Sequence, residues 1–461
     1  MAAAHVLYDD EEIRVVHHPG SSRFSLVTFG SLTDRAEGTR FWGDKAAGKL
    51  DLHAIGFMPK RENWYPVASV ARAAGAVRTV LRPEAVGYGF SMGGYAALKH
   101  GGLLGLTHAL AVSPQATIDP AEVPHEPSYH RHFRPELHAG MRLAAAGLPP
   151  FSVLVADQYD PADGVHAELA AAIGPLHRIP LPFLGHGTIQ LLAGSEALGM
   201  ALRHVRGRDA AGLRRFLRAR RHASKAWHKL LGRAARARGR DAMAERLWGR
   251  ALALGLPPAT LAMERALGTE ERVRRLLRRG AGPQATALAV ALAAAAERRN
   301  AAVLPRLGSL LHSRGHGEEA TLLFRRAVAL DEGSAAAHRG LVNTLLATGR
   351  GEEALEACRR AAHRHPDDAQ IALTLGRLLY ARQDLAGAEA ALRACLRIAA
   401  PGAGALAGQA MHALSHVLAQ RKLWPEAVEL ARGAVARLPG HQHARAWLER
   451  IARPQPLAAS P

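Results

Sequence analysis

The sequence predicts two structural classes in one chain. The N-terminal part is expected to be an α/β domain with a doubly wound parallel sheet, and the C-terminal part an all-α solenoid of helical repeats. Two observations predict this division: short apolar runs alternate with helix-like segments in the first part, and a spacing of 34 residues recurs in the second. The length of 461 residues also exceeds what one ordinary hydrophobic core organises.

The strands of the predicted sheet are short apolar runs, separated by segments long enough for crossover helices. Near-continuous apolarity is typical of strands that are covered on both faces. Parallel strands of this kind place a ligand site at their carboxyl ends. The stretch Ile13–His17 is expected to add an edge strand. The main runs are Phe24–Phe29, Leu52–Met58, Ala85–Phe90, Ala109–Ser113, Ser152–Ala156 and Arg178–Leu184.

A G-x-S-x-G motif carries the clearest chemical signal. Its residues Gly89, Ser91 and Gly93 lie directly after a predicted strand and before a helical run. A serine on so sharp a turn has strained backbone, and side chains two residues to either side would collide. The turn lifts the Ser91 hydroxyl clear of the sheet, and the N–H of Met92 then points at a developing oxyanion. A glycine-rich loop without chemistry is the structural alternative.

Around this motif, at Gly87–Ala97, the chain resembles the α/β-hydrolase superfamily, and within it the small serine esterases and acyl hydrolases. The resemblance covers roughly residues 10–205 and implies the chain order serine, acid, histidine. The expected base is His186, which is flanked by glycines and follows the last predicted strand. A loop histidine without a catalytic role is the alternative.

Three aspartates after the Ser152–Ala156 strand are candidates for the acid. Asp157 lies at the strand end, and Asp160 stands in an Asp-Pro pair, where the resemblance implies that the acid is common. Asp163 is expected to cap the following helix instead. We favour Asp160, with Asp157 as its rival. The acid would orient His186 and stabilise its imidazolium form.

The remaining site predictions concern the loops around the sheet. The backbone N–H of Gly30 or Ser31 is expected to be the second oxyanion donor, although an ordinary Gly-Ser turn explains these residues equally well. Residues 115–150 are expected to form a polar cap that selects the substrate. His130 and His132 form a His-x-His pattern without a cysteine or an orderly carboxylate set nearby. We therefore expect neither a metal nor a cofactor.

In the C-terminal part, small and apolar residues recur at a period of 34. The pattern resembles the tetratricopeptide repeat, a helix–turn–helix unit that implies a protein or peptide partner. A weaker unit fits residues 225–258, and His441–Arg453 is expected to be a capping helix. The recurring positions are Leu307, Leu341 and Leu375; Ala320, Ala354 and Ala388; and Ala327, Ala361 and Cys395.

The net charge of +20 is concentrated in this C-terminal part. Residues 1–195 sum to −2 and residues 196–461 to +22. A basic balance raises nucleic acid or an anionic membrane as a partner. However, no aromatic platform or nucleic-acid motif accompanies the arginines, and no run of ~18 apolar residues is present. We expect a solvated helical surface, with docking of an acidic protein partner as the alternative.

Together these observations predict a cytoplasmic serine hydrolase that cleaves an ester or acyl bond and recruits a partner through its repeats. The cytoplasm is expected because only two cysteines and no signal-like N-terminal segment are present. One alternative is a non-catalytic repeat scaffold with a vestigial hydrolase domain, and another is an acyltransferase with the same triad. The predicted ranges are 1–205 for the hydrolase domain, 206–300 for a basic helical linker, 301–453 for the repeats and capping helix, and 454–461 for a tail.

Overall fold

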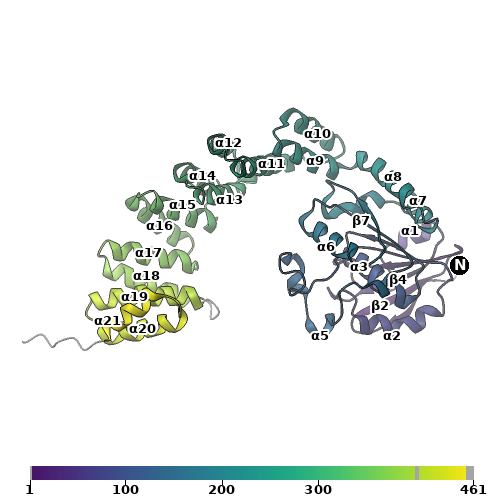
Figure 1. The fold of residues 1–461 in the computed structure, drawn as a ribbon, viewed down its shortest axis with the longest axis horizontal. Coiled ribbons are helices and arrows are strands. Elements are labelled where there is room, and N and C mark those ends of the chain that lie inside the picture. The colour runs from purple at the N-terminus through teal and green to yellow at the C-terminus, as the bar shows by residue number, and fades with distance from the viewer. Residues whose placement is uncertain (1–2, 400–403, 453–461) are drawn as a thin grey trace, which may run out of the picture. The chain divides into compact units, whose positions relative to one another are not determined.

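The computed structural model describes residues 3–399 and 404–452, so the predicted tail lies outside the described residues. The chain divides into two compact units. Unit 1 comprises residues 1–234 and 241–257, and unit 2 comprises residues 235–240 and 258–461 (Figure 1). Unit 1 therefore extends beyond residue 205, where the predicted hydrolase domain ends. The division into a hydrolase domain, a linker and repeats stays a prediction.

Unit 1 is built on an eight-stranded sheet with the order β1-β2-β4-β3-β5-β6-β7-β8. Strand β2 pairs antiparallel with both β1 and β4, and the other pairs are parallel. A mostly parallel sheet is thus confirmed, with one strand more than expected. The strands are β1 (His5–Asp9), β2 (Ile13–His18), β3 (Ser25–Phe29), β4 (His53–Pro59), β5 (Ala85–Phe90), β6 (His108–Val112), β7 (Phe151–Ala156) and β8 (His177–Pro180).

Helices cover both faces of this sheet. Alternate residues of a strand point to opposite faces, so each face presents apolar side chains to its own set of helices. On β3, Val27 and Phe29 join a core with α2, α3 and α6, whereas Leu26 joins a second core with α1, α7 and α8. Figure 1 shows α2 and α7 on opposite sides of the strands. The helices of unit 1 are α1 (Asp44–Lys49), α2 (Val67–Arg78), α3 (Met92–Lys99), α4 (Gly101–Leu104), α5 (Pro135–His138), α6 (Pro161–Ala171), α7 (Ser195–Arg206), α8 (Ala210–Arg220), α9 (Lys225–Ala237, which ends in unit 2) and α10 (Asp241–Ala253).

Unit 2 is a series of antiparallel helix pairs (Figure 1). Small residues at the repeating positions let large side chains enter between the helices. A Cβ at Gly340 would lie 2.0 Å from a ring atom of Phe324, and one at Gly308 would lie 2.9 Å from the same ring. The helices are α11 (Ala259–Arg278), α12 (Gly282–Ala295), α13 (Val303–His312), α14 (Gly317–Leu330), α15 (Ala335–Ala347), α16 (Gly351–Arg364), α17 (Ala369–Ala381), α18 (Leu385–Ile398), α19 (Gly404–Gln420), α20 (Trp424–Arg437) and α21 (Gln442–Ile451).

Within residues 3–399 and 404–452, no helix is long and apolar enough to span a membrane.

Candidate active site

Ser91 lies on the turn between β5 and α3, with φ 54° and ψ −121°. This strained backbone is possible because both motif glycines lack a side chain. A Cβ at Gly89 would lie 2.1 Å from the carbonyl oxygen of Gly93, and a Cβ at Gly93 would lie 2.2 Å from that of Phe29. Contacts this short cannot be relieved without moving backbone. The strand–turn–helix geometry is therefore the one in which a G-x-S-x-G serine is presented as a nucleophile.

Ser91 is hydrogen-bonded to His186, which in turn is hydrogen-bonded to Asp163. His186 is carried by the 3-10 helix η3 (Gly185–Leu192), which follows β8. Its Nε2 atom lies 3.0 Å from the Ser91 Oγ atom, and its Nδ1 atom lies 2.7 Å from the Asp163 Oδ1 atom. The Asp163 side chain is only 1% exposed. This chain of contacts has the geometry of a nucleophile, a base and an orienting acid.

The structure hydrogen-bonds neither Asp160 nor Asp157, the two predicted acids, to His186. Asp160 caps α6 instead: its Oδ1 accepts hydrogen bonds from the N–H groups of Ala162 and Asp163, at 3.2 and 3.1 Å. Asp157 accepts hydrogen bonds from the N–H groups of Leu184 and Gly185, at 2.7 and 2.8 Å. It therefore ties the end of β7 to the segment just before His186. The helix-capping role expected of Asp163 belongs to Asp160, and the first turn of α6 brings Asp163 to His186.

The environment of His186 favours its protonated form. Burial by itself lowers the pKa of this imidazole. The hydrogen bond to Asp163 and the charges of Asp163 and Asp160 outweigh that effect and raise the pKa above its usual value. An imidazole whose protonated form is stabilised in this way can accept the serine proton during an attack.

Of the three predicted oxyanion donors, the structure leaves one available. Met92 is the first residue of α3, so its N–H is among those that the helix itself does not pair. The N–H of Gly30 donates to the carbonyl of Phe57 at 2.9 Å. The N–H of Ser31 donates to the Asp34 carboxylate at 2.7 Å. The structure therefore does not place a second oxyanion donor at Gly30 or Ser31.

Two side chains that the sequence analysis did not single out contact Ser91. The Nε2 amide of Gln115 donates to the Ser91 Oγ atom at 3.3 Å, and its Oε1 atom accepts from the Trp64 indole at 3.2 Å. Both Gln115 and Trp64 are buried. Because the indole can only donate, it fixes the amide with its NH₂ group toward Ser91. The signal available in the sequence was the position of Gln115 shortly after β6, at the carboxyl edge of the sheet.

Tyr129 is the second of these side chains, and its hydroxyl lies close enough to Ser91 to influence its own pKa. Burial, together with the nearby charges of Asp163 and Glu126, raises the pKa of Tyr129 to about 12. Its hydroxyl therefore stays protonated at neutral pH and can donate. Gln115 and Tyr129 both belong to the segment 115–150 that was expected to form a cap.

The two histidines of the His-x-His pattern contact other groups of the protein. The Nε2 atom of His130 lies 3.0 Å from the carbonyl oxygen of Val123, and the ring of His132 packs against that of Trp64 with centroids 5.3 Å apart. Across the described part of the chain, no group of three or more His, Cys, Asp or Glu residues is arranged to hold a metal ion.

Comparisons with known proteins concern the repeats. A family model described as tetratricopeptide repeat matches residues 311–372 and 345–410. Similar solved structures include MamA, which is 20% identical, covers 36% of this chain and 94% of its own, and has a TM-score of 0.31. YrrB, titled a TPR protein with an unusual peptide-binding site, is 18% identical over 42% and 98%, with a TM-score of 0.33. PilF of Pseudomonas aeruginosa is 16% identical over 50% and 99%, with a TM-score of 0.34.

No curated protein matches the chain. The family match covers the segment from α14 to α19, where the 34-residue period and the helix pairs coincide. The C-terminal region of this chain therefore contains tetratricopeptide repeats.

Proposed function

We propose that the N-terminal unit is a serine hydrolase that cleaves an ester or acyl bond. The observation that carries the proposal is the hydrogen-bonded chain from Ser91 through His186 to the buried Asp163. The three side chains lie on segments that follow β5, β7 and β8. Their contacts match those of a nucleophile, a general base and an acid that orients the base.

In the proposed reaction, the Ser91 Oγ atom attacks the substrate carbonyl while His186 takes its proton. Asp163 stabilises the imidazolium that results. The oxyanion would accept hydrogen bonds from the Met92 N–H and the Gln115 amide. The tetrahedral intermediate then expels an alcohol, which takes the proton from His186. A water molecule, deprotonated by His186, then attacks the carbonyl of the acyl-Ser91 ester. The bond to the Ser91 Oγ atom breaks, His186 returns the proton to that oxygen, and the acid is released.

We further propose that the repeats bind a protein or peptide partner, as stacked helix pairs present extended surfaces for such ligands. The comparisons favour the alternative in which the whole chain is a repeat scaffold and its N-terminal unit is vestigial, because the family match falls on the repeats. An acyltransferase would use the same three residues. A cytoplasmic location fits this proposal, since Cys358 and Cys395 are unpaired and buried.

Reaction with a fluorophosphonate probe tests the proposed activity. We expect the native chain to be labelled at Ser91, Ser91→Ala to show no labelling, and Ser128→Ala, which changes a serine outside the hydrogen-bonded chain, to react normally. If the native chain stays unlabelled while a known serine esterase reacts, the scaffold alternative holds. Product analysis with competing alcohol or amine acceptors then separates hydrolysis from acyl transfer.

A further inference from the structure

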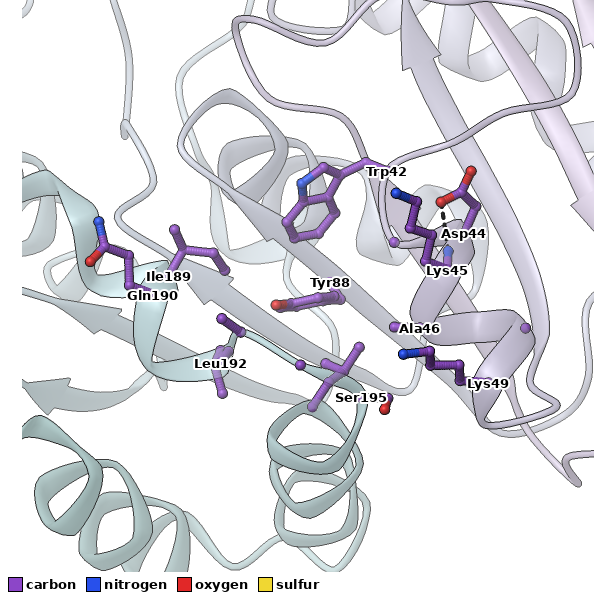
Figure 2. Close-up of a pocket in the computed structure, with 15 residues that line it drawn as sticks. Trp42, Asp44, Lys45, Ala46, Lys49, Tyr88, Ile189, Gln190, Leu192 and Ser195 are labelled. Atoms are coloured by element: carbon purple, nitrogen blue, oxygen red, sulfur yellow. Dashed lines mark hydrogen bonds between the residues drawn. The ribbon is translucent and has the colours of Figure 1, made fainter. Parts of the chain in front are cut away.

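A second feature of unit 1 is a pocket of about 750 Å³ between α1 on one side and η3 with the start of α7 on the other (Figure 2). Its walls are largely apolar, with Trp42, Tyr88, Ile189, Leu192 and Leu198 among the lining residues. This size and composition are typical of sites for small organic molecules. None of the three residues of the candidate triad lines the pocket.

The hydroxyl of Tyr88 lies in this pocket without a protein partner. The Tyr88 side chain is 4% exposed, and none of the described residues forms a hydrogen bond with its hydroxyl. In Figure 2 the ring of Tyr88 lies across the pocket, with its hydroxyl toward Ile189. Because the pocket is open, this hydroxyl is free to donate a hydrogen bond to a molecule bound there. An oxygen acceptor on a bound molecule would satisfy it.

Two lysines give the pocket a positive charge. Lys45 and Lys49 lie one turn apart on α1, and both line the pocket (Figure 2). Neither forms an ion pair in the part of the chain that the structure describes. Asp44 is the acidic residue among those that line the pocket, and its carboxylate already accepts a hydrogen bond from the backbone N–H of Lys45. The charged residues that line the pocket are therefore two lysines and one aspartate, and they leave a net positive charge.

The walls of the pocket belong to the elements that carry the candidate triad. Tyr88 precedes Ser91 by three residues and lies on β5, while Ile189 follows His186 by three residues on η3. A molecule in the pocket would thus contact the same strand and the same 3-10 helix that position the nucleophile and the base.

We propose that this pocket binds an anionic amphiphile: a carboxylate for Lys45 and Lys49, an apolar chain for the walls, and a further oxygen that accepts from the Tyr88 hydroxyl. This inference goes beyond the proposed hydrolase activity, since binding requires no turnover. Ser91→Ala is expected to bind the same molecules as the native chain.

Calorimetric titration of the full chain tests the proposal with three molecules of one length. The probe is 10-hydroxydecanoate; decanoate lacks the second oxygen, and 1,10-decanediol lacks the charge. We expect the native chain to prefer 10-hydroxydecanoate over both. Lys45→Glu/Lys49→Glu should weaken its binding on the order of 10-fold, because two attractions become repulsions, whereas Lys422→Glu in unit 2 should not.

The variant Tyr88→Phe should lose the preference for 10-hydroxydecanoate over decanoate and keep the preference over the diol. Three results would each overturn the proposal: no binding of any of the three molecules at millimolar concentration, equal affinity of the native chain for the carboxylates and the diol, or unchanged binding by the double lysine variant. Because the lysines are exposed on α1, their substitution leaves the core intact.

Discussion

Asp157, Asp160 and Asp163 stand three residues apart and have three different roles. Asp157 holds the backbone ahead of His186, Asp160 caps α6, and Asp163 contacts the imidazole. Their chemistry is identical, so backbone geometry alone assigns the roles. A carboxylate at the N-cap is turned toward the free N–H groups of the helix, and the first turn then directs Asp163 to the buried side.

Substitution of these aspartates by asparagine separates the roles. Asp163→Asn should slow the reaction of Ser91 with a fluorophosphonate by ~10³–10⁴-fold, because the imidazolium loses its counter-charge. Asp160→Asn should react at nearly the native rate, because asparagine caps a helix as well as aspartate does. Labelling rates for the two folded variants provide the measurement. Equal losses in both would contradict the assignment of Asp163 as the acid.

Gln115 is expected to act on the transition state more than on substrate binding. Gln115→Leu should lower kcat for a nitrophenyl ester by ~10²–10³-fold with a smaller change in KM, since one oxyanion donor is removed. Trp64→Phe keeps the Gln115 amide but removes the indole that holds its Oε1 atom, so we expect a smaller loss of kcat. Steady-state kinetics, with thermal unfolding as a check on folding, test this. A kcat for Gln115→Leu close to the native value would exclude the role.

At the scale of elements, apolar runs predicted the buried strands β3 to β7, and the motif glycines predicted the turn after β5. Strand β1 was missed because its residues are mostly exposed or half-buried, so it has no apolar run. The aspartate that contacts His186 was not the one predicted, for a different reason. Residue spacing does not reveal where α6 begins, and that starting point decides which aspartate faces His186.

In unit 2, the ring of Phe324 occupies the space that side chains at Gly308 and Gly340 would need. Gly340→Ala should destabilise the chain by ~1–3 kcal/mol through overpacking. Phe324→Leu combined with Gly340→Ala should cost less than the sum of the two single changes, because the smaller side chain makes room. Denaturant unfolding measures these free energies.

Gly249→Ala is the matched control, since a Cβ there meets no atom within 4 Å. It should be neutral or stabilising. Strict additivity of the two changes at Phe324 and Gly340 would contradict this account of the repeat packing.

At the scale of the whole molecule, several arginines of unit 2 form ion pairs between successive helix pairs. These pairs join residues about one repeat apart in sequence, so they link neighbours along the solenoid. Examples are Arg306 with Glu270, Arg325 with Glu353, Arg382 with Glu352, Arg393 with Glu426, and Arg421 with Glu389.

These pairs predict that acid weakens unit 2. Burial alone would raise the pKa of Glu270, but its hydrogen bonds to Arg306 and Arg274 lower the pKa below its usual value. A lowered pKa in the folded state contributes stability above the pKa of the unfolded chain, and this stability is lost as pH falls through the folded value. Glu270→Gln should therefore cost ~1–3 kcal/mol at pH 7 and progressively less toward pH ~3.

Urea unfolding of the native chain and of Glu270→Gln at both pH values measures this difference. Glu319→Gln, at a position with no ion pair among the described residues, serves as the control. A cost that is the same at both pH values would contradict the electrostatic explanation.

The position of Asp163 within α6 makes the site sensitive to chain length in a way that substitutions do not reveal. One residue inserted after Gly164 would rotate Asp163 by about 100° relative to the packed face that contains Ala167 and Ala170. The carboxylate would then point away from His186 even if every original side chain were kept. On this helix, the number of residues between Asp163 and the buried alanines decides whether the carboxylate faces His186.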